Sequence, residues 1–204
     1  RHSVIYLLGR LVPSIVSLYA IALYTRILTP EQYGHYALVI AGVGVINGVC
    51  FQWLSFSISR FLPIHKNQPA VLLSTALIGF LMLVVITGVF GGMLAWLWPD
   101  KLLRWPIMLT VIVCWAQAWF DLNLRIVNIR LAPALYGFLT SFKALIAISL
   151  GAALFYLDLG IYGIFLGLII SLFIATLFVW KHWDAFAIRH HDVRLLRNLI
   201  GYGA

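Results

Sequence analysis

The stretch VLLSTALIGFLMLVVITGVFGGMLAWLW, residues 71–98, decides the class of fold, because it contains no charged side chain. A helix rises about 1.5 Å per residue, so a run of this length crosses the roughly 30 Å hydrocarbon core of a bilayer. The whole chain has the same character: 63% of its 204 residues are hydrophobic and 10% are charged. In a soluble domain about a quarter of the residues are charged. The sequence therefore predicts an integral membrane protein.

Further apolar runs lie on both sides of this stretch, and each is long enough to cross a bilayer as a helix. Together they predict an all-α bundle of six transmembrane helices over residues 1–184. Thr29-Pro30-Glu31 supplies an N-cap, an N1 proline and an acidic first turn before the second helix. Residues 157–160, Leu-Asp-Leu-Gly, form a turn so short that the last two helices are expected to make an antiparallel hairpin. The six expected spans are about 4–24, 36–58, 71–98, 103–124, 136–157 and 161–179.

The basic residues indicate the orientation of these spans in the membrane. One side holds only Arg26, Lys101 and Arg104, while ten Lys and Arg residues fall on the other. Cytoplasmic loops carry the excess of Lys and Arg, so we expect both termini in the cytoplasm. Topology and anionic headgroups account for the formal net charge of +8, and we expect no nucleic-acid partner. The ten residues are Arg1, Arg10, Arg60, Lys66, Arg125, Arg130, Lys181, Arg189, Arg194 and Arg197.

Residues 185–204 are expected to form a basic cytoplasmic connector. Apolar Ile188 and Leu195 alternate with basic Arg189 and Arg194, which suits a helix lying on an anionic leaflet. A solvated connector leading to a further span fits the same residues equally well. The last residues, 200–204, have the character of the start of such a truncated span.

Polar residues inside several spans fall on one helix face. A polar side chain in a membrane is costly and usually faces the bundle interior or a water-filled cavity. We therefore predict a cavity lined by the first, second, fourth and fifth spans. The third and sixth spans carry only scattered Ser and Thr and are expected to face lipid. The stripes comprise Arg10, Ser14 and Ser17, then Gln52, Ser55 and Ser59, then Gln117, Asp121, Arg125 and Asn128, and finally Lys143 with Thr140 and Tyr136.

Each of these residues also has a structural interpretation. The long side chains of Arg10 and Lys143 can extend to the headgroups instead of a cavity. Asp121 and Arg125 have the i,i+4 spacing of an ion pair on one helix face, as an alternative to a substrate or proton site. Ser and Thr hydroxyls can bond to their own helix or to a neighbouring one.

Three pairs of glycines have the GxxxG spacing that lets membrane helices approach closely. They are Gly44–Gly48, Gly88–Gly92 and Gly163–Gly167. We take them as evidence of packing and assign them no function.

The chain carries no signature of an enzyme. It has no phosphate-binding glycine loop, no HExxH motif and no nucleophile elbow, and His190-His191 is too small a cluster to imply a metal site. We therefore expect no catalytic residue, metal or cofactor. Energy for any transport would come from an ion or substrate gradient.

The stretch YTRILTPEQYGHYAL, residues 24–38, resembles a signature of the polysaccharide-transport branch of the multidrug/oligosaccharidyl-lipid/polysaccharide exporter superfamily. Members typically show an Arg, a short apolar step, a Pro-Glu pair and a Tyr-Gly pair between their first two helices. These elements stand here as Arg26, Pro30-Glu31 and Tyr33-Gly34. The resemblance extends over nearly the whole chain, through residues 55–63, 125–154, 159–171 and 192–203.

The resemblance implies the first lobe of a two-lobe transporter with twelve or more helices around a central cavity. Such proteins are flippases that move undecaprenyl-diphosphate-linked oligosaccharides, such as O-antigen, capsule or exopolysaccharide units, across the bacterial inner membrane by alternating access. The implied partners are this lipid, membrane lipids, and the polymerase and chain-length components of glycan assembly. On this hypothesis Arg10 and Lys143 contact the diphosphate. The remaining assignments are Ser14, Ser17, Gln52 and Ser55 to sugar hydroxyls, and Arg26, Asp121 and Arg125 to an ion pair or a gate.

Two alternatives stay open. A multidrug exporter of the same superfamily would extrude organic cations with a sodium or proton gradient. That chemistry needs intramembrane acids, and the spans offer essentially one, Asp121, against several basic residues. A membrane-embedded glycan enzyme or a non-transporting assembly scaffold is the second alternative. The expected outer loops, 25–35, 99–102 and 158–160, are short for such an enzyme.

Overall fold

The computed structural model describes residues 2–62, 69–99, 101–129 and 133–179, and for residues 2–13, 69, 101–102 and 133 it describes the backbone alone. Within these ranges the chain is helical and contains no β-strand. The predicted connector, residues 185–204, lies outside the described residues. The helices are α1 (His2–Ile27), α2 (Pro30–Ile46), η1 (Asn47–Phe51), α3 (Gln52–Phe61), α4 (Pro69–Leu97), α5 (Lys101–Ile129), α6 (Pro133–Leu154), η2 (Phe155–Leu159) and α7 (Gly160–Leu177).

The prediction of an all-helical chain is confirmed for the described residues, and four helical stretches, not six, are long and apolar enough to cross a bilayer. One of them, Ala134–Leu177, is 44 residues long and contains the turn between α6 and α7. The part of α1 whose side chains the structure describes, Ser14–Ile27, is apolar as well. The count differs because two expected spans, α6 and α7, lie in one of these stretches on either side of its turn, and because the side chains of α1 are described only from Ser14 onward. The four stretches are Pro30–Phe61, Ala70–Leu97, Leu103–Ile129 and Ala134–Leu177.

The turn between α1 and α2 is tighter than the sequence suggested. Thr29 caps α2: its side chain accepts a hydrogen bond from the backbone N–H of Gln32, and the Gln32 side chain accepts one from the backbone N–H of Thr29. This reciprocal capping box satisfies two N–H groups that a helix start otherwise leaves without partners. Helix α2 therefore begins at Pro30, well before the expected residue 36, and only Leu28 and Thr29 separate it from α1.

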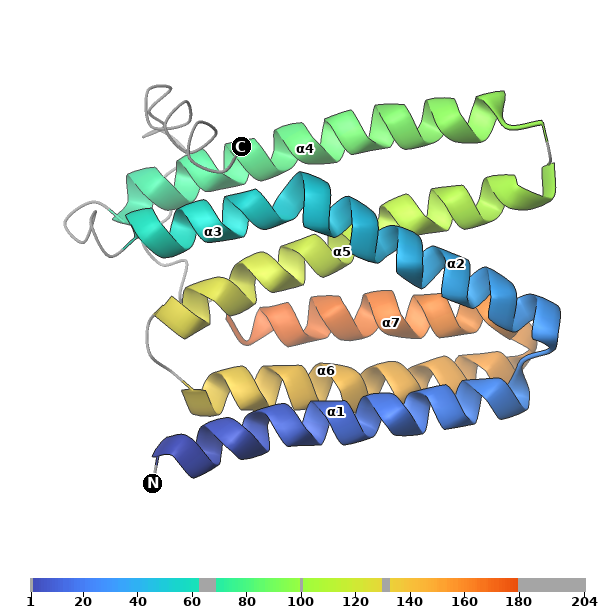
Figure 1. The fold of residues 1–204 in the computed structure, drawn as a ribbon, viewed down its shortest axis with the longest axis horizontal. Coiled ribbons are helices and arrows are strands. Elements are labelled where there is room, and N and C mark those ends of the chain that lie inside the picture. Colours follow the sequence, from blue (N-terminus) through green and yellow to red (C-terminus); the bar gives the residue numbers. More distant parts are fainter. Residues whose placement is uncertain (1, 63–68, 100, 130–132, 180–204) are drawn as a thin grey trace.

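The second membrane-crossing stretch contains a π-helical turn. At η1 the backbone N–H of Gln52 bonds to the carbonyl oxygen of Asn47, five residues earlier. The wider turn bends the rod that α2 and α3 form together, as Figure 1 shows. Short π-helical segments of this kind frequently occur at functional sites.

Helices α6 and α7 form the expected antiparallel hairpin and pack closely along their lengths. The chain reverses where Asp158 and Gly160 adopt positive φ angles of 64° and 54°. A Cβ atom added to Gly167 would meet the backbone nitrogen of Gly151 and lie 2.7 Å from its Cα. A Cβ atom added to Gly163 would lie 2.7 Å from the carbonyl carbon of Leu154. Of the GxxxG pairs, Gly163–Gly167 is thus the one at which two backbones meet.

Helix α7 has one buried face and one exposed face. It lies between α5 and α6 (Figure 1), where Phe165 and Leu172 are almost fully buried. Leu166, Phe173 and Leu177 are exposed, so the sixth span presents apolar side chains outward on its other face, as expected of a helix that faces lipid. The third span also presents apolar side chains outward, since Val85, Val89 and Phe90 of α4 are exposed.

Candidate functional site

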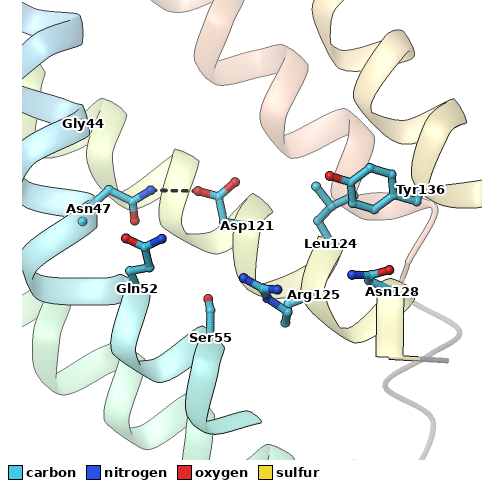
Figure 2. Close-up of a pocket in the computed structure, with 10 residues that line it drawn as sticks. Gly44, Asn47, Gln52, Ser55, Asp121, Leu124, Arg125, Asn128 and Tyr136 are labelled. Atoms are coloured by element: carbon cyan, nitrogen blue, oxygen red, sulfur yellow. Dashed lines mark hydrogen bonds between the residues drawn. The ribbon is translucent and has the colours of Figure 1, made fainter. Parts of the chain in front are cut away.

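A polar cavity of about 440 Å³ lies among α2, η1, α3, α5 and α6 (Figure 2). Gln52 and Ser55 of α3 and Arg125 of α5 point toward one another across it. Gly44 and Gly48 leave room on the wall formed by α2 and η1, because a Cβ atom at either glycine would meet no atom closer than 3.7 Å. The cavity is lined by Gly44, Asn47, Gly48, Gln52, Ser55, Asp121, Leu124, Arg125, Asn128 and Tyr136.

A second cavity, of about 460 Å³, adjoins the first and is mostly apolar. It lies where α1 and α2 diverge, with α5, α6 and α7 forming its other walls. Gly44 and Asn47 line both cavities, so the two are neighbours. Lys143 is the charged member of its lining, which otherwise includes Val16, Ser17, Ala20, Tyr24, Tyr36, Ile40, Val43, Val113, Gln117, Ala144, Ala147, Ile148, Ile164 and Leu168.

A chain of hydrogen bonds links the two cavities. The Asp121 carboxylate accepts bonds from the side-chain amides of Asn47 and Gln117, each at 2.8 Å. The Lys143 ammonium donates to the Gln117 amide oxygen at 3.1 Å. Four polar side chains from η1, α5 and α6 therefore satisfy one another, which removes much of the cost of placing them in a membrane.

The two cationic side chains of the site also lie over aromatic rings. The Lys143 Nζ is 5.0 Å from the centroid of the Phe120 ring, and the Arg125 Cζ is 5.3 Å from that of Phe56. Such contacts attract a cation to the ring face and are strongest when water is excluded. They hold both cations at the cavities, and for Lys143 the alternative was an extended side chain reaching the headgroups. The carboxylate of Asp121 meets amides, and Arg125 lies over a ring, so the i,i+4 spacing of these two residues does not describe their contacts.

The structure brings most of the predicted site residues together. Ser17 and Lys143 line the apolar cavity, and Gln52 and Ser55 line the polar one with Asp121 and Arg125. Ser14 is exposed on α1, and Arg26 is exposed near its C-terminal end. The side chain of Arg10 lies outside the described residues.

Asn47 is the residue that the sequence analysis missed. Five residues separate it from Gln52, so on an α-helix the two would lie on different faces. The π-helical turn changes this phase and lets Asn47 line the same cavity as Gln52 and Ser55. An asparagine inside an apolar run was itself a signal, because polar side chains in membranes usually serve a site or a packing contact.

The arrangement suits binding better than covalent chemistry. Hydroxyl and amide groups at the polar cavity can exchange hydrogen bonds with a ligand rich in hydroxyls. The cations Arg125 and Lys143 can bind an anionic group. Within the described ranges, no group of three or more His, Cys, Asp and Glu residues could hold a metal ion. No protein-family model, curated protein sequence or solved structure matches this chain.

Proposed function

We propose that this chain is the first lobe of a flippase that moves an undecaprenyl-diphosphate-linked oligosaccharide across the bacterial inner membrane. The observation that carries the proposal is the pair of cavities between apolar helices, with Lys143 and Arg125 at their walls. The resemblance around Arg26, Pro30-Glu31 and Tyr33-Gly34 supplies the substrate class. A second lobe would complete the transporter, and a gradient would drive it.

The proposed topology has six crossings with both termini in the cytoplasm. Helices α1, α4, α5, α6 and α7 would each cross once, and α2, η1 and α3 would cross together. The hairpin turn at Asp158 and Gly160 supports counting α6 and α7 as separate crossings. Helix α1 has 26 residues, which at about 1.5 Å per residue is long enough to cross.

A diphosphate must pass through a region where a bare charge is expensive. Cationic side chains replace part of its hydration with charge-assisted hydrogen bonds, which are stronger than neutral ones. The Lys143 ammonium has three N–H donors, and one of them already goes to Gln117. The remaining capacity would serve the substrate, while Gln52, Ser55 and Asn128 at the polar cavity would meet sugar hydroxyls.

The test uses the full-length gene in its native cell. Deletion is expected to remove the glycan from the surface of intact cells while its lipid-linked unit accumulates inside, as read by a sugar-specific antibody before and after permeabilisation. Complementation with Lys143→Gln or Arg125→Gln is expected to restore surface glycan poorly. Arg60→Gln is the matched control, because Arg60 is exposed at the end of α3. Unchanged surface glycan in the deletion strain would refute the proposal.

One observation favours an exporter of organic cations as the second candidate. Asp121 is an intramembrane acid, and it lines the polar cavity. That function predicts that the deletion strain becomes sensitive to cationic dyes while its surface glycan stays unchanged. Asp121→Asn would then reproduce the dye sensitivity, whereas Lys143→Gln would not.

A further inference from the structure

The two cavities differ in chemistry and lie in a fixed order along the bundle. On α5, Val113 and Gln117 line the apolar cavity, and Asp121 to Asn128 line the polar one. On α6, Tyr136 lines the polar cavity, and Lys143 to Ile148 line the apolar one. At about 1.5 Å per residue, both helices separate the middles of the two linings by roughly 14 Å. The polar cavity is nearer the end of the bundle at which α1 begins and α3 ends (Figure 1).

Lys143 stands at the boundary between the two cavities. Its side chain lines the apolar cavity and donates to Gln117, which in turn donates to Asp121 at the polar cavity. Both carboxylate oxygens of Asp121 accept amide N–H groups, and the Gln117 amide lies between this carboxylate and the Lys143 ammonium. An anionic group at the boundary would therefore meet an ammonium before it met the carboxylate.

We infer that the two cavities bind the two parts of one amphiphile: the saccharide in the polar cavity, the phosphate at Lys143, and the first isoprenoid units of the lipid in the apolar cavity. This assignment rests on the proposed function and adds to it the place of each part of the substrate. The order also agrees with the proposed topology. A lipid in the cytoplasmic leaflet has its head toward the end where α1 begins and its chain toward the bilayer middle.

The size of the apolar cavity limits what it holds. At about 460 Å³ it falls within the range of small-molecule sites. It therefore accommodates only the part of the long chain next to the phosphate, and the rest stays in the bilayer. Its walls at Ala144, Ala147 and Ile148 on α6 and Ile164 on α7 offer apolar contact but no chain-specific polar group.

The test measures binding to the purified chain in lipid nanodiscs with synthetic probes. One probe is farnesyl diphosphate joined to N-acetylglucosamine, and the second carries a methyl group in place of the farnesyl chain. A third is farnesyl diphosphate without sugar. Ala144→Phe fills the apolar cavity, and Ala153→Phe places the same side chain at an exposed position of the same helix. Gly48→Leu fills the polar cavity, and Gly92→Leu is its control on α4, where an added Cβ meets nothing within 4 Å.

We expect Ala144→Phe to weaken binding of the farnesyl probe by about tenfold, a loss of about 1.4 kcal/mol, and to leave the methyl probe unchanged. Gly48→Leu should weaken the sugar-bearing probes by a similar factor and leave farnesyl diphosphate unchanged. Both controls should bind every probe as the unsubstituted chain does. Partition of a probe into the nanodisc lipid is the same for each matched pair, so it cancels from the comparison.

A melting curve shows whether each variant is folded. If Ala144→Phe is not, the gain in binding from the methyl to the farnesyl probe on the unsubstituted chain takes its place, after the uptake of each probe by nanodiscs without protein is subtracted. Equal binding of the farnesyl and methyl probes to that chain, after the same subtraction, overturns the inference. So does equal binding of the farnesyl probe to Ala144→Phe and Ala153→Phe, or of sugar-bearing probes to Gly48→Leu and Gly92→Leu. The cellular deletion experiment tests the flippase function separately. If the lipid chain stays entirely in the bilayer, the deletion still removes surface glycan, but the farnesyl and methyl probes bind the purified chain equally.

Discussion

Replacing Gly167 with Val should separate α6 from α7. A Cβ atom at this position would meet the Gly151 backbone nitrogen and lie 2.7 Å from the Gly151 Cα and 2.9 Å from the Leu150 carbonyl carbon. These are backbone atoms of the facing helix, so no side chain can rotate away to make room. Carbon atoms prefer separations of about 3.5–4.0 Å, and the two helices would have to move apart by about 1 Å.

The loss of folding free energy can be worked out from helix propensity and from the packing between α6 and α7. Gly and Val differ little in helix propensity, so the intrinsic change nearly cancels. Overpacking a dense interior costs about 1–3 kcal/mol of folding free energy. Gly167→Val should cost about 3 kcal/mol, because its Cβ meets rigid backbone atoms and the valine adds two further methyl groups. A change of 1 kcal/mol shifts the melting temperature of a domain of this size by about 2–4 °C. We therefore expect a loss of about 6–12 °C.

Thermal unfolding in detergent measures this loss through the fluorescence of the eight tryptophans. Gly92→Val is the matched control, because a Cβ atom at Gly92 meets nothing within 4 Å. It should melt close to the unsubstituted chain. If the two variants melt within about 2 °C of each other, the reasoning that α6 and α7 meet backbone to backbone at Gly167 is wrong.

Three further outcomes follow from local contacts and topology. Thr29→Ala removes one half of the capping box at the start of α2 and should lower the free energy of unfolding by about 1 kcal/mol, measured by thermal denaturation against the exposed control Thr25→Ala. Asp121→Leu leaves the Asn47 amide donor without its acceptor and should destabilise by about 1–3 kcal/mol, whereas Asp121→Asn keeps an acceptor and should cost less; an equal cost for both would contradict the hydrogen-bond assignment. In a cysteine-free background, Glu31→Cys should react with an impermeant maleimide added outside spheroplasts, and Arg60→Cys only after lysis; the opposite pattern would contradict the proposed orientation.

Local chemistry made much of the fold predictable. The Thr29-Pro30-Glu31 sequence marked the start of a helix, and the Leu-Asp-Leu-Gly turn marked a hairpin, because capping and turn residues act within a few positions of themselves. The exact start of α2 was missed since residues 30–35 are polar enough to interrupt a hydropathy run, although they complete a capping box.

The candidate site was predictable in part for the same reason. Helical spacing placed Gln52 with Ser55 and Asp121 with Arg125, and these residues do line one cavity. Asn47 was not predicted to join them, because the π-helical turn at η1 changes the helical phase by a backbone hydrogen bond that no local residue pattern announces. Gln117 lies four positions before Asp121 on the same helix, as the predicted polar stripe placed it, but the bond from Asn47 was hidden because that residue comes from a distant part of the chain.

The sequence by itself determined that this chain is an all-helical membrane protein, where its main turns fall and which faces of its helices are polar. Those properties depend on the transfer of each residue to lipid and on contacts within one or two helical turns. Only the tertiary structure decided that α7 lies between α5 and α6, that Asn47, Asp121, Gln117 and Lys143 form one hydrogen-bonded chain, and that a polar cavity adjoins an apolar one. These features arise where distant segments pack against each other. Gly163 and Gly167 let the backbones of α6 and α7 meet, and the π-helical turn η1 turns Asn47 toward the polar cavity.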